Sequence, residues 1–216
     1  MRSLLISTMM AGAALVATPA GATVIICDGA NCVNTDENVL VDKNDTPSSL
    51  VTGSTQSGVN VTFTSTTDLL IGAANGQATI DAQDGLLNNL TFSMLDGYSF
   101  GSAIFNLEGY AGNIAGEATS VLLAYYDPAL KTFGTLAVKT NGQNFFGIYG
   151  DAGERFYGVT ISGDPVTTGW GQLKQLRVGG VGMIPEPATW AMMILGMGAV
   201  GAAMRRRKVR VNYSMA

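Results

Sequence analysis

The sequence predicts an all-β fold, an antiparallel β-sandwich of jelly-roll type, with one apolar helix added at each end of the chain. Three observations favour this class. Short runs in the centre of the chain alternate apolar and polar residues, as residues 59–64 and 157–161 do. Turn dipeptides such as Asn-Gly and Asp-Gly separate these runs. No long central segment repeats its apolar residues every 3.6 positions, as an amphipathic helix would.

Each alternating run is expected to form a strand with one buried and one solvated face. The strand candidates are residues 59–64, 79–81, 90–94, 103–107, 120–126, 135–139, 144–149, 157–161 and 173–178. Asn75-Gly76 and Asn141-Gly142 are expected to close hairpins, because such pairs tolerate the positive φ angles of a type I′ turn. An all-β solenoid is the alternative, which the lack of a sequence repeat disfavours.

Composition sets the expected domain boundaries. Residues 23–57 are polar and rich in turn formers, so we expect an N-terminal arm there. Residues 58–178 are the predicted β-sandwich domain, and the glycine-rich residues 179–184 are expected to be a flexible linker. The 216 residues leave room for one ordinary domain and its processing segments.

Several classes of function are excluded by composition. Histidine is absent, which excludes Ser-His-Asp and Cys-His catalysis and His-ligated zinc. Residues 23–184 carry 15 acidic and 6 basic side chains, and this net charge of −9 would repel nucleic acid. No nucleophile motif or cofactor fingerprint is present, so we assign no catalytic residue and expect a protein that is not an enzyme.

The first 22 residues have the layout of a secretory signal peptide. Arg2 precedes an apolar run over residues 4–17, and small residues at Ala20 and Ala22 frame a cleavage site. We expect a signal helix that is removed after Ala22, so that the mature chain begins at Thr23. An uncleaved membrane anchor is the alternative, which the short apolar run disfavours.

The other end of the chain predicts a transmembrane helix over residues 188–204, which are uncharged. Pro185 and Pro187 mark the change from extended chain to helix, since proline is excluded from a helix interior. Arg205, Arg206 and Arg207 would stop the helix on the cytoplasmic side and leave the body exported.

The order Pro185-Glu186-Pro187, apolar helix and Arg205-Arg206-Arg207 resembles the PEP-CTERM protein-sorting signal of Gram-negative bacteria. The resemblance implies a membrane-anchored precursor, a processing enzyme of the exosortase type that recognises the three-residue motif, and delivery to the cell surface or extracellular matrix. It also implies surroundings rich in exopolysaccharide. A plain single-pass anchor, in which Pro-Glu-Pro only ends the helix, is the alternative.

The cysteines Cys27 and Cys32 predict a small disulfide loop, because an exported chain meets an oxidising compartment. A zinc site is disfavoured, since the chain has no further cysteine and no histidine. We expect no metal ligands and no cofactor, with calcium the one ion left open. The oxygen ligands considered for it are Asp42, Asn44, Asp45, Asp81, Asp84, Asp151 and Glu154.

The aromatic pairs Tyr125-Tyr126, Phe145-Phe146 and Phe156-Tyr157 should place one ring on each face of a strand. Outward rings, together with Trp170, would offer a stacking platform for sugars. We therefore expect an exported structural or interaction protein, and the alternative is a carbohydrate- or calcium-binding, lectin-like module.

Overall fold

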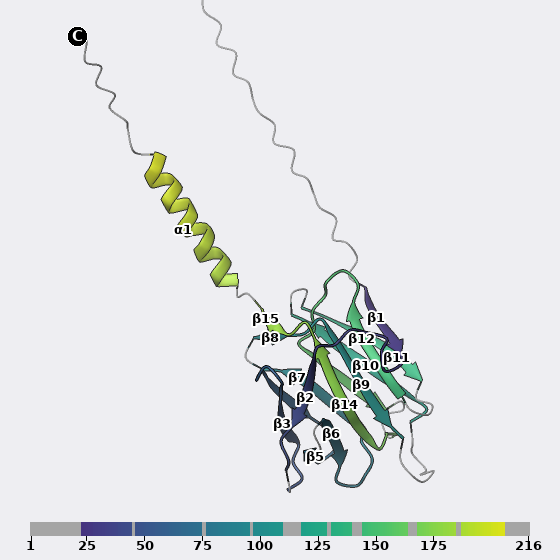
Figure 1. The fold of residues 1–216 in the computed structure, drawn as a ribbon. Helices are drawn as coiled ribbons and strands as arrows, with labels where there is room; N and C mark the ends of the chain where they lie inside the picture. Colours follow the sequence, from purple (N-terminus) through teal and green to yellow (C-terminus); the bar gives the residue numbers. More distant parts are fainter. Residues whose placement is uncertain are drawn as a thin grey trace, which may run out of the picture.

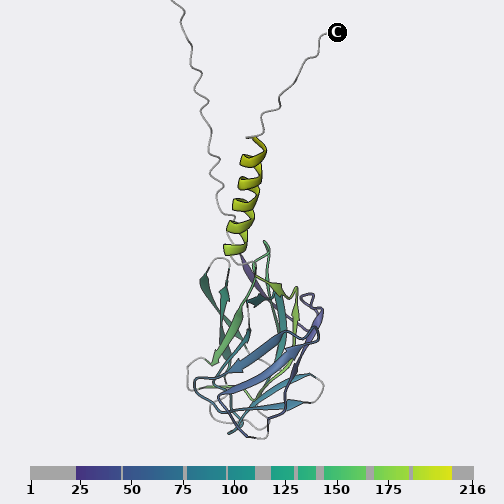
Figure 2. The ribbon, with the colours of Figure 1, turned by 90° about the vertical axis from the view of Figure 1, so that its left-hand side faces the viewer.

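The computed structural model describes residues 23–44, 46–74, 77–95, 97–109, 118–128, 131–139, 144–163, 168–184 and 187–205. Its strands gather in one body, from which the helix α1 (Pro187–Arg205) projects (Figure 1, Figure 2). The residues of the predicted signal helix, 1–22, lie outside the described part of the chain.

Thirteen of the fifteen described strands form one antiparallel sheet that curls into two layers, and the other two strands pair with each other. We call the first layer sheet A; it comprises β1 (Val24–Asp28), β12 (Asn144–Gly150), β9 (Ser102–Glu108), β14 (Gln172–Gly179), β6 (Ala78–Ala82) and β5 (Leu70–Ala74). The second, sheet B, comprises β3 (Leu50–Thr55), β4 (Asn60–Thr64), β7 (Asn89–Met94), β13 (Gly158–Gly163), β10 (Ser120–Asp127) and β11 (Thr132–Lys139). Strand β2 (Glu37–Val41) joins the layers, because its start pairs with β14 and its end pairs with β3.

The predicted all-β, antiparallel class is confirmed. Neighbours in sheet A run β6-β14-β9-β12 and those in sheet B run β7-β13-β10-β11. Along these eight strands the chain therefore changes layer at every step except from β10 to β11. This is the alternation of a jelly roll.

One predicted hairpin forms and the other does not. Strands β5 and β6 pair across residues 75–76 as expected. Strands β11 and β12 do not form a hairpin across residues 140–143, since β11 pairs with β10 and β12 pairs with β9 and β1. The turn residues themselves lie outside the described ranges.

The core lies between the two layers and uses the residues that alternation predicts. Val61, Phe63, Phe92 and Ile161 are at most 1% exposed. Phe92 of sheet B meets Phe105 of sheet A edge to face, with ring centroids 5.8 Å apart, so aromatic contacts join the layers directly.

Residues 23–57 differ from the predicted turn-rich arm, because they contribute β1, β2 and β3. The polar composition of this segment hides short strands, of which β3 alternates buried Val51 and Thr55 with exposed Leu50 and Thr52. Val39 and Val51 are buried, whereas Asp42, Lys43 and Ser49 between them are exposed. The segment is part of the sandwich because it supplies the strand that connects the two sheets.

Residues 179–184 also differ from the predicted flexible linker. Gly179 ends β14, and β15 (Gly182–Met183) pairs with β8 (Tyr98–Ser99). The N–H of Ile184 donates to the carbonyl of Gly97 at 2.8 Å. Gly180 has a positive φ of 62°, so glycine serves a specific backbone conformation here and not flexibility.

A helix forms where a transmembrane helix was predicted. In the part of the chain that the structure describes, no helix combines the length and the apolar character that crossing a membrane requires. The 19 residues of α1 rise by about 28 Å, slightly less than the ~30 Å hydrocarbon core, and they begin with a proline and end with an arginine.

Candidate functional site

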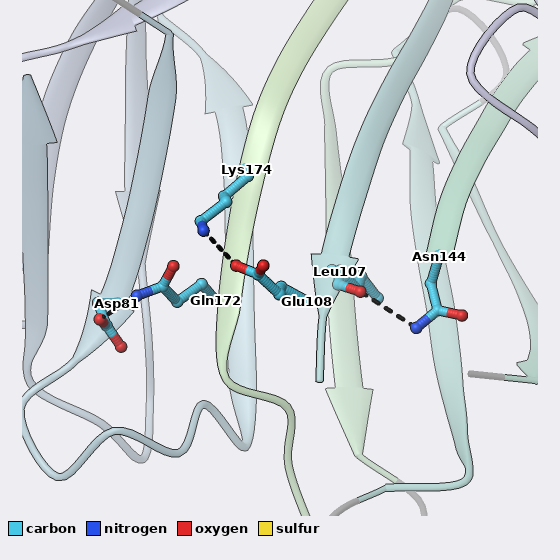
Figure 3. Close-up of polar contacts among 6 residues, drawn as sticks. All are labelled: Asp81, Leu107, Glu108, Asn144, Gln172 and Lys174. Carbon is cyan, nitrogen blue, oxygen red and sulfur yellow. Dashed lines mark hydrogen bonds and ion pairs between the residues drawn. The ribbon is translucent and has the colours of Figure 1, made fainter. Parts of the chain in front are cut away.

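A row of polar side chains crosses the outer face of sheet A. Gln172 on β14 pairs in register with Asp81 on β6 and with Glu108 on β9. Lys174, two residues further along β14, lies on the same face as Gln172, while Leu173 between them is fully buried in the core. Three segments that are far apart in the sequence therefore meet in one polar surface (Figure 3).

The side chains of this row bind one another in pairs. The amide Nε2 of Gln172 donates to Oδ2 of Asp81 at 2.6 Å, and the Nζ of Lys174 forms an ion pair with Oε2 of Glu108 (Figure 3). The side chain of Lys174 is 33% exposed and that of Glu108 is 50% exposed. Solvated ion pairs contribute about 0–1 kcal/mol. A polar ligand could therefore replace this one at little cost.

The row borders two adjoining hollows. The first has a volume of about 450 Å³ and is lined by Asp81, Gly85, Glu108, Gly109, Gly171, Gln172 and Lys174. The second, of about 420 Å³, shares Asp81, Gln172 and Lys174 and extends along β5 and β6. Both volumes lie within the range of small-ligand sites.

Asn106 on β9 lies beside this surface with an unmet hydrogen-bonding capacity. Its neighbours in register are Lys174 on β14 and Phe145 on β12, and its side chain is opposite in direction to the core residues Phe105 and Leu107. Asn106 is 7% exposed, and its Oδ1 has no partner among the described residues. A buried acceptor without a donor is costly, but this oxygen exposes almost no surface and Asn106 does not line either hollow.

The opposite end of the same face is covered by the segment between β1 and β2. Cys27 and Cys32 form a disulfide in this segment, with a Cα–Cα separation of 6.0 Å. The segment packs on Gly147 of β12, where a Cβ would lie 2.6 Å from the Sγ of Cys32. The hydroxyl of Ser102 donates to the carbonyl of Asn34 at 2.7 Å. The disulfide thus holds a segment that covers part of this face, and we call it the covering segment.

Trp170 is not part of a surface platform, contrary to the sequence-based prediction. It is 2% exposed and belongs to the core, and its neighbours Gly169 and Gly171 fit the tight packing around it rather than an exposed loop.

The aromatic pairs do divide between the two faces of their strands. Phe146 and Phe156 are core residues. On the outer face of sheet B, Tyr126 stacks on Phe133 with ring centroids 4.7 Å apart, and Tyr157 meets Tyr126 edge to face at 6.2 Å. Phe133 is 76% exposed. This aromatic cluster lies on the opposite layer from the polar row.

The oxygen ligands considered for calcium are not brought together. Asp42 accepts a hydrogen bond from the hydroxyl of Thr52, and Asp84 accepts one from the N–H of Leu86 within its own turn. In the described ranges, no group of three or more Asp, Glu or Cys residues is placed to hold a metal ion. Asp45 lies outside those ranges.

The turn that follows β12 carries two charged residues that sequence analysis did not single out as a unit. Glu154 accepts hydrogen bonds from the N–H groups of Thr23, at 2.9 Å, and Ala152, at 2.8 Å. Burial by itself raises the pKa of Glu154, but the N–H groups of Glu154, Ala152 and Thr23 hold this pKa below its ordinary value.

Arg155, the next residue, binds the chain just before the tail. Its Nε donates to Oγ of Ser99 at 2.6 Å, and its Nη2 donates to the carbonyls of Ser99, at 2.8 Å, and Gly180, at 2.7 Å. We call Arg155, Ser99 and Gly180 the Arg155 clamp. It fixes the segment that sequence analysis took for a flexible linker.

Most residues predicted for processing fall outside the described part of the chain. Ala20, Ala22, Pro185, Glu186, Arg206 and Arg207 are among them. Pro187 is the first residue of α1 and Arg205 the last. From Thr189 to Arg205 every residue of α1 is exposed, including Met192, Ile194 and Leu195, which are 66% to 70% exposed.

Comparison with known families identifies the tail. Residues 184–208 match the PEP-CTERM protein-sorting motif, so the chain carries this motif at the place where sequence analysis predicted it. No curated protein matches the chain.

A solved structure of a family 29 carbohydrate-binding module, a mutant studied for ligand recognition, aligns with 70% of this chain and 99% of its own. Its identity is 14% and its TM-score 0.36, and so weak a likeness has no bearing on the site.

Proposed function

We propose that this protein is exported and delivered to the cell surface or the extracellular matrix, where its β-domain has a structural or interaction role without catalysis. The observation that carries the proposal is the PEP-CTERM motif at residues 184–208. In this scheme an exosortase-like enzyme processes the precursor at the membrane. The exposed apolar side chains of α1 support a tail that requires an apolar environment, because a helix with this composition is poorly solvated in water.

Intact mass and N-terminal sequencing of the native protein, after fractionation of cells, test this route. We expect a species that begins at Thr23, lacks Trp190 and is recovered outside the inner membrane. A Glu186→Ala variant should keep its tail, whereas the matched control Thr189→Ala, which changes only the helix, should be processed normally. A mature protein that still contains Trp190 in the inner membrane would refute the sorting proposal.

A second candidate function is the binding of a neutral polysaccharide at the hollow beside Asp81, Gln172 and Lys174. The specific observation is the set of paired donors and acceptors that lines the hollow, Gln172 with Asp81 and Lys174 with Glu108. Sugar hydroxyls both donate and accept, which suits such a surface. The net charge of −9 over residues 23–184 favours a neutral glycan over a polyanionic one.

Affinity electrophoresis in gels that contain neutral or acidic polysaccharides tests this candidate. The double variant Gln172→Ala/Lys174→Ala should lose about tenfold or more in affinity, as expected when one or two good hydrogen bonds are removed. The control Phe133→Ala alters the aromatic cluster on the other layer. Loss of binding in the control alone, or no retardation by any glycan, would exclude the hollow as the site.

A further inference from the structure

The first residue after the predicted signal cleavage site forms hydrogen bonds through both its N–H and its carbonyl. The N–H of Thr23 donates to Oε1 of Glu154 at 2.9 Å, and the carbonyl of Thr23 accepts the N–H of Asp151 at 3.0 Å. Val24 then pairs with Gly150 as the first step of the β1–β12 ladder. The backbone nitrogen that signal removal would turn into the chain terminus therefore already donates a hydrogen bond to a carboxylate.

The side chain of Glu154 is buried against the backbone of its own turn. Its residue is 8% exposed, and its side chain folds back over Gly150, where a Cβ would lie 2.5 Å from both Cβ and Oε2 of Glu154. Gly153 supplies a φ of 86° that turns the chain back. The peptide N–H groups of Thr23, Ala152 and Glu154 are neutral donors, whereas a covered carboxylate is stabilised most by a cation.

We infer that the carboxylate of Glu154 is the binding site for the α-ammonium group of mature Thr23, and that signal removal converts a neutral hydrogen bond into an ion pair that fastens β1. The inference rests on the proposed export route, which supplies the cleavage. Hydrolysis adds water across the Ala22–Thr23 peptide bond, so that Ala22 leaves with a carboxylate and Thr23 gains the protons of an ammonium group. The new charge forms on the nitrogen that Glu154 already binds.

The charges around this corner have the required sign. The titratable groups on the elements that meet there are Asp28 on β1, Tyr149 on β12, and Asp151, Glu154 and Arg155 on the turn. Arg155 is directed to Ser99 and Gly180 instead of to Glu154. The acidic groups favour the protonated amine, so its pKa in the folded protein should rise above the usual ~7.7–8.0.

A raised pKa fixes the direction of the pH dependence. The stabilisation by the ion pair is complete below the pKa of the unfolded amine, and it is lost as the pH rises through the higher pKa of the folded protein. A chain with residues in front of Thr23 has no such loss, because its Thr23 nitrogen remains an amide.

The test compares two forms of the full mature chain in mild detergent. One is released from a cleavable fusion so that Thr23 is its first residue, and the other retains Gly21 and Ala22 in front. At pH 6 to 7 the first should melt about 3 °C higher, the shift expected from a single partly covered ion pair in a domain of this size. The difference should vanish near pH 10 and in the Glu154→Gln forms, which can still accept the amide hydrogen bond. Equal melting temperatures at pH 7, or a difference that survives pH 10 or Glu154→Gln, would overturn the inference.

N-terminal sequencing of the exported protein separates this inference from the proposed function. A native chain that starts at Thr23 supports the inference. A start at another residue overturns it, even where loss of the tail shows that sorting occurs. Conversely, the melting comparison can support the ion pair even if the native tail proves to be uncleaved.

Discussion

Replacement of Arg155 by alanine should release the segment that leads into the sorting motif. The substitution removes three hydrogen bonds from a charged donor and leaves two oxygens of Ser99, a residue that is 0% exposed, without this partner. A buried acceptor left unpaired costs about 1–3 kcal/mol. Because the guanidinium is partly solvated, we expect a total loss of about 2–3 kcal/mol in the free energy of unfolding, equal to about 5–10 °C in melting temperature.

Urea unfolding measures the global effect, and amide hydrogen exchange measures the local one. The N–H of Ile184, which donates to Gly97, should exchange at least tenfold faster in Arg155→Ala. Arg155→Lys keeps the charge but replaces the planar fork by a single ammonium, so its loss should be smaller. Lys131→Ala, at an exposed cation, is the matched control and should change neither readout. If Arg155→Ala has the same urea midpoint and the same Ile184 protection as the wild type, the clamp is not what fixes the segment.

Three further predictions concern the disulfide, the glycine that it packs on and two carboxylates. Cys27→Ser should lower the free energy of unfolding by about 2 kcal/mol in urea titrations, as expected for a short loop, and a thiol reductant should then have no further effect. Gly147→Ala should cost about 1–3 kcal/mol, and less in the Cys27→Ser background, because the new Cβ contacts the cysteine sulfurs; equal costs in both backgrounds would contradict this. The pKa values of Glu37 and Glu154 are lowered in the folded protein: burial raises them, but backbone and hydroxyl donors outweigh it. The stabilisation by these carboxylates is therefore present above the ordinary pKa of 4.5 and is lost as the pH falls through the lower values of the folded protein. Urea midpoints measured from pH 6 to 3 should show this loss, and the loss should be smaller in Glu154→Gln.

The turn at Glu154 and Arg155 fixes the chain near both ends of the domain. Thr23 and Gly180, near the two ends of the domain, are bound by the adjacent residues Glu154 and Arg155. Both predicted processing sites therefore lie next to fixed backbone. Such an arrangement would protect the domain itself from proteolysis while leaving the tail accessible.

Local sequence patterns determined the strands in the centre of the chain and the sorting motif, but not β1, β2 and β3. The alternation in residues 59–64 and 90–94 places Phe63 and Phe92 in the core, because side chains of a strand change face at every residue. The motif at Pro185 is likewise local, since a short linear signal needs no partner from elsewhere in the chain.

Only the tertiary structure decided which strands become neighbours. Residues 140–143 carry a good hairpin signal, yet β11 and β12 belong to different layers. Asp81, Glu108 and Gln172 form one polar row through the registers of β6, β9 and β14. Register depends on pairing between distant segments, and a pattern of period two repeats in every strand alike, so it cannot select the partner. For the same reason the sequence placed Trp170 in an exposed loop, whereas the packing of the two sheets buries it.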